Sequence, residues 1–182
     1  MLKTQRICFA INVLLAVTIV ASTTSLQAQS APPLNDPTIV AIFDAANTWD
    51  IETGSLAAKR GTTAEVRAFG KMLVRDHTAV RKLGRDLARK LGVTPTPPKN
   101  FAMEKDHVET MRKLKAATTA EFDRMFLSLD VAYHTAVIGA VESTLLPAAQ
   151  NKEFKDLVTS VVPAFKGHRD AGQQLLDKIN KR

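Results

Sequence analysis

Three of the four histidines fall near the middle of three long segments in which apolar residues recur at helical spacing. They are His77, His134 and His168, and Asp50 lies at the middle of a fourth such segment. An unpaired polar group under apolar cover costs roughly 2–7 kcal/mol, so inward-facing ionisable side chains need partners or a task. Imidazole nitrogens and carboxylate oxygens are ligands for zinc, iron and manganese. We therefore predict that these four residues bind one transition-metal ion in the protein interior.

The spacing along the chain predicts that the four side chains lie at a common depth. The first two segments turn near Thr62, and a rise of 1.5 Å per residue places their aspartate and histidine about 18 and 22 Å from that turn. The last two segments turn near Gln150, and their histidines then lie about 24 and 27 Å from it. Each hairpin brings its pair to one level, so the metal prediction does not depend on how the two hairpins are connected.

A single ion fits this pattern better than a pair of ions. Di-metal carboxylate bundles of the ferritin type use a carboxylate on every helix and a Glu-x-x-His step on two of them. The chain has no such step at this depth, and its nearest feature, Asp130-x-x-x-His134, is one residue longer. Neighbouring carboxylates could add ligands or orient the rings; they belong to Glu52, Asp76, Asp123 and Asp130.

Two other hypotheses for the histidines stay open. An inward histidine can simply complete a hydrogen-bond network in a helical core, and the protein would then be a structural or interaction module. A redox or hydrolytic metalloenzyme is the third hypothesis, although the chain has no Gly-rich phosphate loop and no Gly-x-Ser-x-Gly elbow. The fourth histidine, His107, lies on a mostly charged segment and is predicted to be a surface residue.

The composition and the periodicity predict an all-α fold. Only 5% of the residues are aromatic, and 8 glycines and 8 prolines are few for a chain of strands and tight turns. Four long amphipathic segments with one long connection predict a four-helix bundle with a ferritin-like layout. The connection, from about Val93 to Thr119, carries a short polar helix between the second and third long helices. Caps are predicted at Asp36, at Thr62 or Thr63, and at Thr118 or Thr119.

The first 28 residues have the pattern of a secretory signal peptide. Lys3 and Arg6 precede an apolar run from Ile7 to Ala21, which is shorter than the roughly 20 residues of a spanning helix. Small polar residues then lead to Ala28, after which cleavage is expected. The predicted organisation is a signal peptide over 1–28, a linker over 29–36 and a helical bundle over 37–182.

Export constrains the cofactors and partners of the mature chain. Cys8 lies in the apolar run and leaves with it, so the mature chain offers no thiol ligand to a metal. Loss of Lys3 and Arg6 lowers the formal net charge from +7 to +5, and a periplasmic location argues against a nucleic-acid partner. These charges are interpreted as solvated helix faces. The alternative is a weak peripheral attraction to anionic lipid or polysaccharide at the envelope surface, and no protein partner is indicated.

Four motifs together resemble a bacterial family of exported proteins known as domain of unknown function 4142. They are Asp50-x-Glu52-x-Gly54-x-Leu56-Ala57, Glu65-Val66-x-x-Phe69 with Asp76-His77, Phe122-Asp123 with His134, and Val162-Pro163-x-x-x-x-His168. The resemblance covers about Pro37 to Asn180 and implies a ferritin-like helical bundle that is exported to the periplasm. Members are often labelled outer-membrane proteins, and the family usually has Glu at the position of Asp50. The leading hypothesis is a periplasmic bundle, soluble or peripheral to the outer membrane, that binds one metal ion or acts in envelope stress.

Overall fold

The computed structural model describes residues 34–181. The predicted signal peptide and most of the predicted linker lie outside the described residues. The first helix begins at Asp36, the last residue of that linker, and its N-cap is Asn35, whose side chain accepts a hydrogen bond from the Thr38 amide at 3.0 Å. The prediction of Asp36 as the cap is therefore wrong by one residue. Its carboxylate instead accepts hydrogen bonds from the amides of Gln150 and Asn151, and so holds the loop before the last helix.

The described residues form helices and no strand. The elements are α1 (Asp36–Arg60), α2 (Ala64–Lys90), α3 (Ala102–Ala116), α4 (Thr119–Ala140), the π-helical turn η1 (Val141–Leu145), α5 (Leu146–Ala148) and α6 (Lys152–Asn180). The prediction of an all-α helical bundle is confirmed. The caps follow the sequence pattern: Thr63 accepts from the Val66 amide, and Thr118 forms a reciprocal capping box with Glu121.

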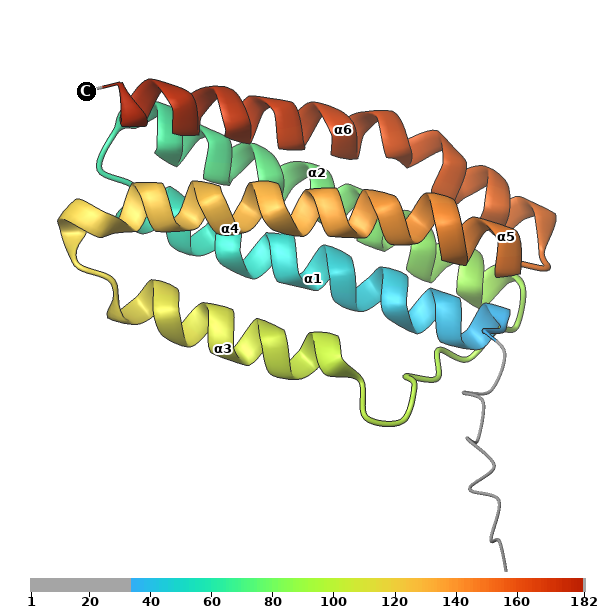
Figure 1. The fold of residues 1–182 in the computed structure, drawn as a ribbon. Coiled ribbons are helices and arrows are strands. Elements are labelled where there is room, and N and C mark those ends of the chain that lie inside the picture. Colours follow the sequence, from blue (N-terminus) through green and yellow to red (C-terminus); the bar gives the residue numbers. More distant parts are fainter. Residues whose placement is uncertain (1–33, 182) are drawn as a thin grey trace, which may run out of the picture. The chain divides into compact units, whose positions relative to one another are not determined.

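The four long helices pack side by side in the bundle. α1 contacts α2 and α4, and α6 contacts the same two helices. After α2, the connection with α3 runs back along the bundle, so that α2 and α4 point in the same direction (Figure 1). The sequence left this direction open. None of the described helices combines the length and the apolar character that are needed to cross a membrane.

α3 lies against α1 and α4 and covers part of the core. Its Leu114 is fully buried. The ring of His107 stacks on Trp49 with centroids 5.1 Å apart, and its side chain is only 19% exposed. The prediction of His107 as a surface residue is therefore wrong, because Trp49 on α1 presents a flat apolar face that the charged pattern of α3 did not reveal.

A layer of polar side chains divides the core into two apolar clusters. One cluster contains Phe43, Phe154 and Phe165, and the other contains Phe69 and Phe126. Each long helix passes from one cluster to the other through a segment with buried polar residues. In chain order these are Asn47 and Asp50 on α1, His77 on α2, Asp130 and His134 on α4, and His168 on α6. The apolar clusters on both sides therefore hold the polar layer in the protein interior.

The close approach of α1 and α2 near this layer depends on Gly70. A Cβ atom at this position would lie 2.6 Å from the backbone nitrogen of Ala58 and 2.6 Å from the carbonyl oxygen of Gly54. Backbone atoms cannot move aside as a flexible side chain can, so a larger residue must push the helices apart.

Replacement of Gly70 by Ala is expected to lower the free energy of unfolding by at least about 1–3 kcal/mol, the usual cost of overpacking. Urea denaturation measures this change. The matched control is Gly167→Ala on α6, where a Cβ atom meets nothing within 4 Å and helix propensity favours Ala by up to about 1 kcal/mol. Equal stability of the Gly70 variant and the wild type would show that the two helices are not in tight contact here.

Candidate metal centre

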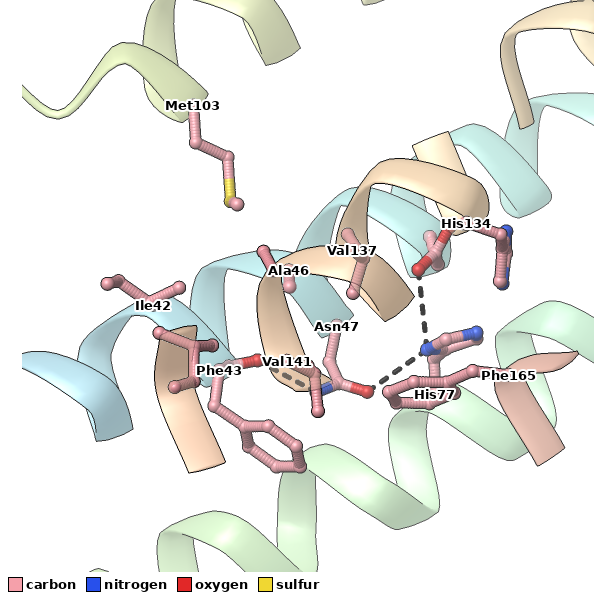
Figure 2. A pocket seen from close by; sticks show the side chains of 13 residues that line it. Ile42, Phe43, Ala46, Asn47, His77, Met103, His134, Val137, Val141 and Phe165 are labelled. Carbon is pink, nitrogen blue, oxygen red and sulfur yellow. Dashed lines mark hydrogen bonds and ion pairs between the residues drawn. The ribbon is translucent and has the colours of Figure 1, made fainter. Parts of the chain in front are cut away.

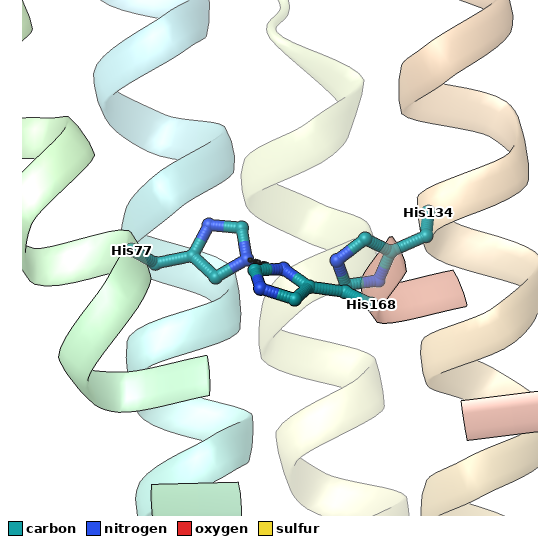
Figure 3. Close-up of side chains that lie close together, drawn as sticks. All are labelled: His77, His134 and His168. Carbon is teal, nitrogen blue, oxygen red and sulfur yellow. Dashed lines mark hydrogen bonds between the residues drawn. The ribbon is translucent and has the colours of Figure 1, made fainter. Parts of the chain in front are cut away.

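Three imidazole rings from three helices meet in the polar layer. His77 comes from α2, His134 from α4 and His168 from α6, and the exposed fraction of each residue is 6% or less. One nitrogen of each ring lies within 4.8 Å of a nitrogen of the other two. Figure 3 shows the three rings turned toward one another. The structure thus brings together three of the four residues that the spacing pattern selected.

Hydrogen-bond partners determine which nitrogen of His77 carries a proton. Asn47 donates its side-chain amide to the Phe43 carbonyl at 2.7 Å, so its Oδ1 atom faces His77 as an acceptor. This oxygen lies 3.0 Å from His77 Nδ1, and an Asp50 oxygen lies 3.4 Å from the same nitrogen. Figure 2 shows Asn47 directed at the ring. Two acceptors on Nδ1 require a proton there, which leaves the lone pair on Nε2.

The other two rings are oriented in the same way. The backbone oxygen of Asp130 lies 3.1 Å from His134 Nδ1, and its carboxylate lies 3.5 Å from that nitrogen. The carboxylate of Asp76 lies 3.2 Å from His168 Nε2. Protons on these nitrogens leave a lone pair on His168 Nδ1, and on His134 Nε2 once that ring has lost its second proton. Each histidine therefore has a carboxylate on its protonated side, an arrangement that metal-bound histidines commonly show.

The remaining nitrogens of the three rings face one another. His77 Nε2 lies 3.1 Å from His168 Nδ1, and His134 Nε2 has no hydrogen-bond partner among the described residues. At 3.1 Å the nitrogens of His77 and His168 either share a proton in a hydrogen bond or bind one cation between them. Ligands about 2.0–2.1 Å from a tetrahedral zinc ion lie about 3.4 Å from one another, and the nitrogens of His77 and His168 are close to this spacing. Three protein ligands also leave one coordination position for water or another small ligand.

The fourth predicted ligand, Asp50, lies on a different side of the rings. Its carboxylate is 3.4 Å from His77 Nδ1 and 4.0 Å from His134 Nδ1, whereas the converging lone pairs belong to the other nitrogens. Together with Asp130 and His134 it forms a second group of buried ligand atoms within 4.8 Å of one another. Asp50 as a ligand of the histidine-bound ion stays a prediction.

The neighbouring carboxylates divide into two sets. Asp76 and Asp130 contact histidines of the centre, as described above. Asp123 instead accepts hydrogen bonds from the backbone amide and the hydroxyl of Thr62, in the loop before α2. Glu52 lies 3.4 Å from His107. Asn47 was not among the residues predicted from the sequence. The signal was its position three residues before Asp50, which places it on the same helix face.

A family model described as a domain of unknown function, DUF4142, matches residues 21–175 of the chain. The chain belongs to the DUF4142 family. The matched range includes all four predicted ligands, and the resemblance seen in the motifs is confirmed. No curated protein and no solved structure matched the chain in the other two comparisons.

Burial and charge set the protonation of this DUF4142 centre. Burial lowers the pKa of His77 to about 2, and it also lowers the pKa of His168. Burial would lower the pKa of His134 too, but Asp50 and Asp130 outweigh this effect and raise that pKa to about 9. Burial raises the pKa of Asp50 to about 8. At neutral pH the rings of His77 and His168 are neutral, as metal ligands must be. The ring of His134 carries a second proton and is positively charged.

Zinc binding at pH 7 is therefore expected to release at least one proton per chain. His134 must lose a proton to act as a ligand, whereas His77, with its pKa near 2, has none to lose. Below the His134 pKa of about 9, a higher pH removes the competing proton, so the zinc affinity should rise about tenfold per pH unit from pH 6 to pH 8.

Isothermal titration calorimetry in two buffers of different ionisation enthalpy measures the number of protons released. An affinity that does not change between pH 6 and pH 8, with no proton released, would contradict a protonated His134 in the metal-free protein.

Proposed function

We propose that this DUF4142 protein binds a divalent transition-metal ion, zinc, iron or manganese, at His77, His134 and His168. The observation that carries the proposal is the convergence of three ring nitrogens within 4.8 Å of one another, with 3.1 Å between His77 Nε2 and His168 Nδ1. The protonated side of each ring faces at least one carboxylate, so the rings are already oriented to bind a cation. Asp50 positions His77 in this arrangement.

We further propose that the protein is exported and acts in the periplasm, soluble or peripheral to the outer membrane. The support is the positive start, the apolar run and the small-residue exit of the first 28 residues. A metal site without cysteine suits this oxidising compartment, because histidine and aspartate form no disulfides. A role in envelope or stress physiology is the functional setting that we propose for such a metal-binding bundle.

Elemental analysis tests the metal proposal. Protein treated with a chelator, dialysed against zinc, manganese or iron(II) and then desalted is expected to retain at least one ion per chain. The ion binds only the folded state, so the melting temperature should rise, by an amount that corresponds to about 2.7 kcal/mol at a free metal concentration 100 times Kd. No retained metal and an unchanged melting temperature would reject the proposal in favour of a structural module with buried histidine networks.

A further inference from the structure

Three buried carboxylate oxygens in the centre have no hydrogen-bond partner within residues 34–181. They are Asp50 Oδ1, Asp130 Oδ1 and Asp130 Oδ2, and the two residues are 3% and 5% exposed. Burial of an unpaired carboxylate is costly. An ion at the three histidines would bind His134 Nε2, the other unpartnered atom in the centre, but it would leave these oxygens on the Nδ1 sides of the rings. A second cation bound beside them would satisfy these oxygens.

The geometry of these oxygens suits a metal ion. An Asp130 oxygen and an Asp50 oxygen lie 3.5 and 4.0 Å from His134 Nδ1, close to the spacing of about 3.4 Å between two ligands of one tetrahedral ion. The Asp130 backbone oxygen lies 3.1 Å from the same nitrogen and offers a further oxygen ligand to an ion. Asp130 and His134 stand four residues apart on one face of α4, opposite Asp50 on α1.

A cavity provides space beside two of these ligands, Asp50 and His134. It has a volume of about 40 Å³, and Asp50, His77 and His134 line it together with apolar side chains that include Phe43 and Val137 (Figure 2). One water molecule needs roughly 10–15 Å³ of such volume, so water ligands of an ion can be accommodated here.

We propose that the centre is dinuclear, with a second divalent cation bound by Asp50, Asp130 and His134. This inference rests on the proposed function, because His134 gives Nε2 to the first ion. Its Nδ1 proton is released to solvent, and the Nδ1 lone pair then binds the second ion. Two divalent ions carry four positive charges. The deprotonated ring and the carboxylates of Asp50 and Asp130 offset three of them, and Asp76, which also pairs with Arg75, lies beside His168. Two carboxylates and one nitrogen favour a harder ion than three imidazoles do.

The dinuclear centre differs from the single ion that we predicted from the sequence. The missing Glu-x-x-His step argues only against a site with a carboxylate on every helix. In the structure the ligands are distributed unevenly, with the imidazoles of His77 and His168 on one side of His134 and the carboxylates of Asp50 and Asp130 on the other. The shared histidine replaces the bridging carboxylates of the ferritin-type pattern.

The number of zinc ions per chain tests this inference. The chelator-treated protein, dialysed against Zn²⁺ and desalted, is expected to hold two ions by elemental analysis. Asp130→Asn should hold one, because the three histidines remain, and the exposed control Asp170→Asn should hold two. Asp50→Asn should also hold one, and it provides a second measurement if Asp130→Asn does not fold by circular dichroism.

Each other outcome has a separate meaning. One zinc ion in the wild type would overturn the second site and leave the histidine site standing. Two ions in the wild type and two in both folded aspartate variants would show that the second ion binds elsewhere, which also overturns the inference. No zinc in the wild type would overturn the proposed function itself.

Discussion

Replacement of His168 by Ala is expected to weaken zinc binding at the three histidines by at least about 100-fold while the bundle stays folded. Loss of a residue that hydrogen-bonds to a metal ligand typically lowers the metal affinity 10–100-fold. His168 is proposed as a ligand itself, so its loss should have at least the larger of these effects. Its partner Asp76 has a side chain that is 30% exposed, so water can replace the lost hydrogen bond. Competition with a chromogenic chelator measures the affinity, and far-ultraviolet circular dichroism measures the helix content.

The matched control is His107→Ala, which removes the same kind of side chain outside the centre. His107 contacts Trp49 and Glu52 and none of the three converging rings, so zinc affinity should not change. If His168→Ala bound zinc as tightly as the wild type, the ion would not lie at the histidines. If the variant unfolded and the wild type held no metal, His168 would be part of a structural network.

Replacement of Asp50 by Asn is expected to stabilise the metal-free protein while it weakens metal binding. Burial raises the pKa of Asp50 from 3.8 to about 8, so the folded state must take up a proton at neutral pH, at a cost on the order of 4 kcal/mol at pH 7. Asn is neutral at every pH and avoids this cost. An imperfectly paired amide costs about 1–3 kcal/mol, which leaves a net gain of about 1–3 kcal/mol.

The pH dependence has a definite sign. The folded pKa of Asp50 lies above the unfolded value, so its penalty is absent below about pH 3.8, grows as the pH rises and is complete above about pH 8. Over this range the stability difference between Asp50→Asn and the wild type should grow by about 1.4 kcal/mol per pH unit. Urea denaturation at pH 5 and at pH 7.5, both with a chelator present, measures the difference.

Asp170→Asn is the control for the Asp50 variant. Asp170 has an exposed side chain and pairs with Arg169, so its replacement should change the stability by no more than about 0.5 kcal/mol at either pH. A metal-free Asp50→Asn protein that is less stable than the wild type at both pH values would assign Asp50 a structural role. The same result would weaken the metal proposal, because a buried acid kept for function is expected to lower stability.

The polar layer explains why Asp50→Asn is expected to stabilise the metal-free protein and yet to weaken metal binding. It interrupts the apolar core on all four long helices, and it contains carboxylate oxygens with no hydrogen-bond partner among the described residues. Such groups lower the stability of the metal-free fold, whereas a bound cation would satisfy them. Folding and metal binding are therefore expected to be coupled in this protein.

Periodicity and capping residues were sufficient to predict the helices. Apolar residues at three- and four-residue steps define one face of each long segment, and caps such as Thr63 and Thr118 mark where helices begin. The common depth of His77, His134 and His168 also followed from residue counts, because a helix rises by a constant distance per residue. These features are local, so they can be predicted without knowledge of the neighbouring helices.

The orientation of each ring was decided only by the tertiary structure. Asn47 and Asp76 come from helices other than those of the histidines that they contact, and their oxygens determine which nitrogen keeps the lone pair. The position of Asp50 on the protonated side of His77 has the same origin, as does the stacking of His107 on Trp49. Helical spacing specifies a face and a depth. The rotation of a ring about its side-chain bonds depends on atoms that are distant in sequence, and those become neighbours only when the helices pack.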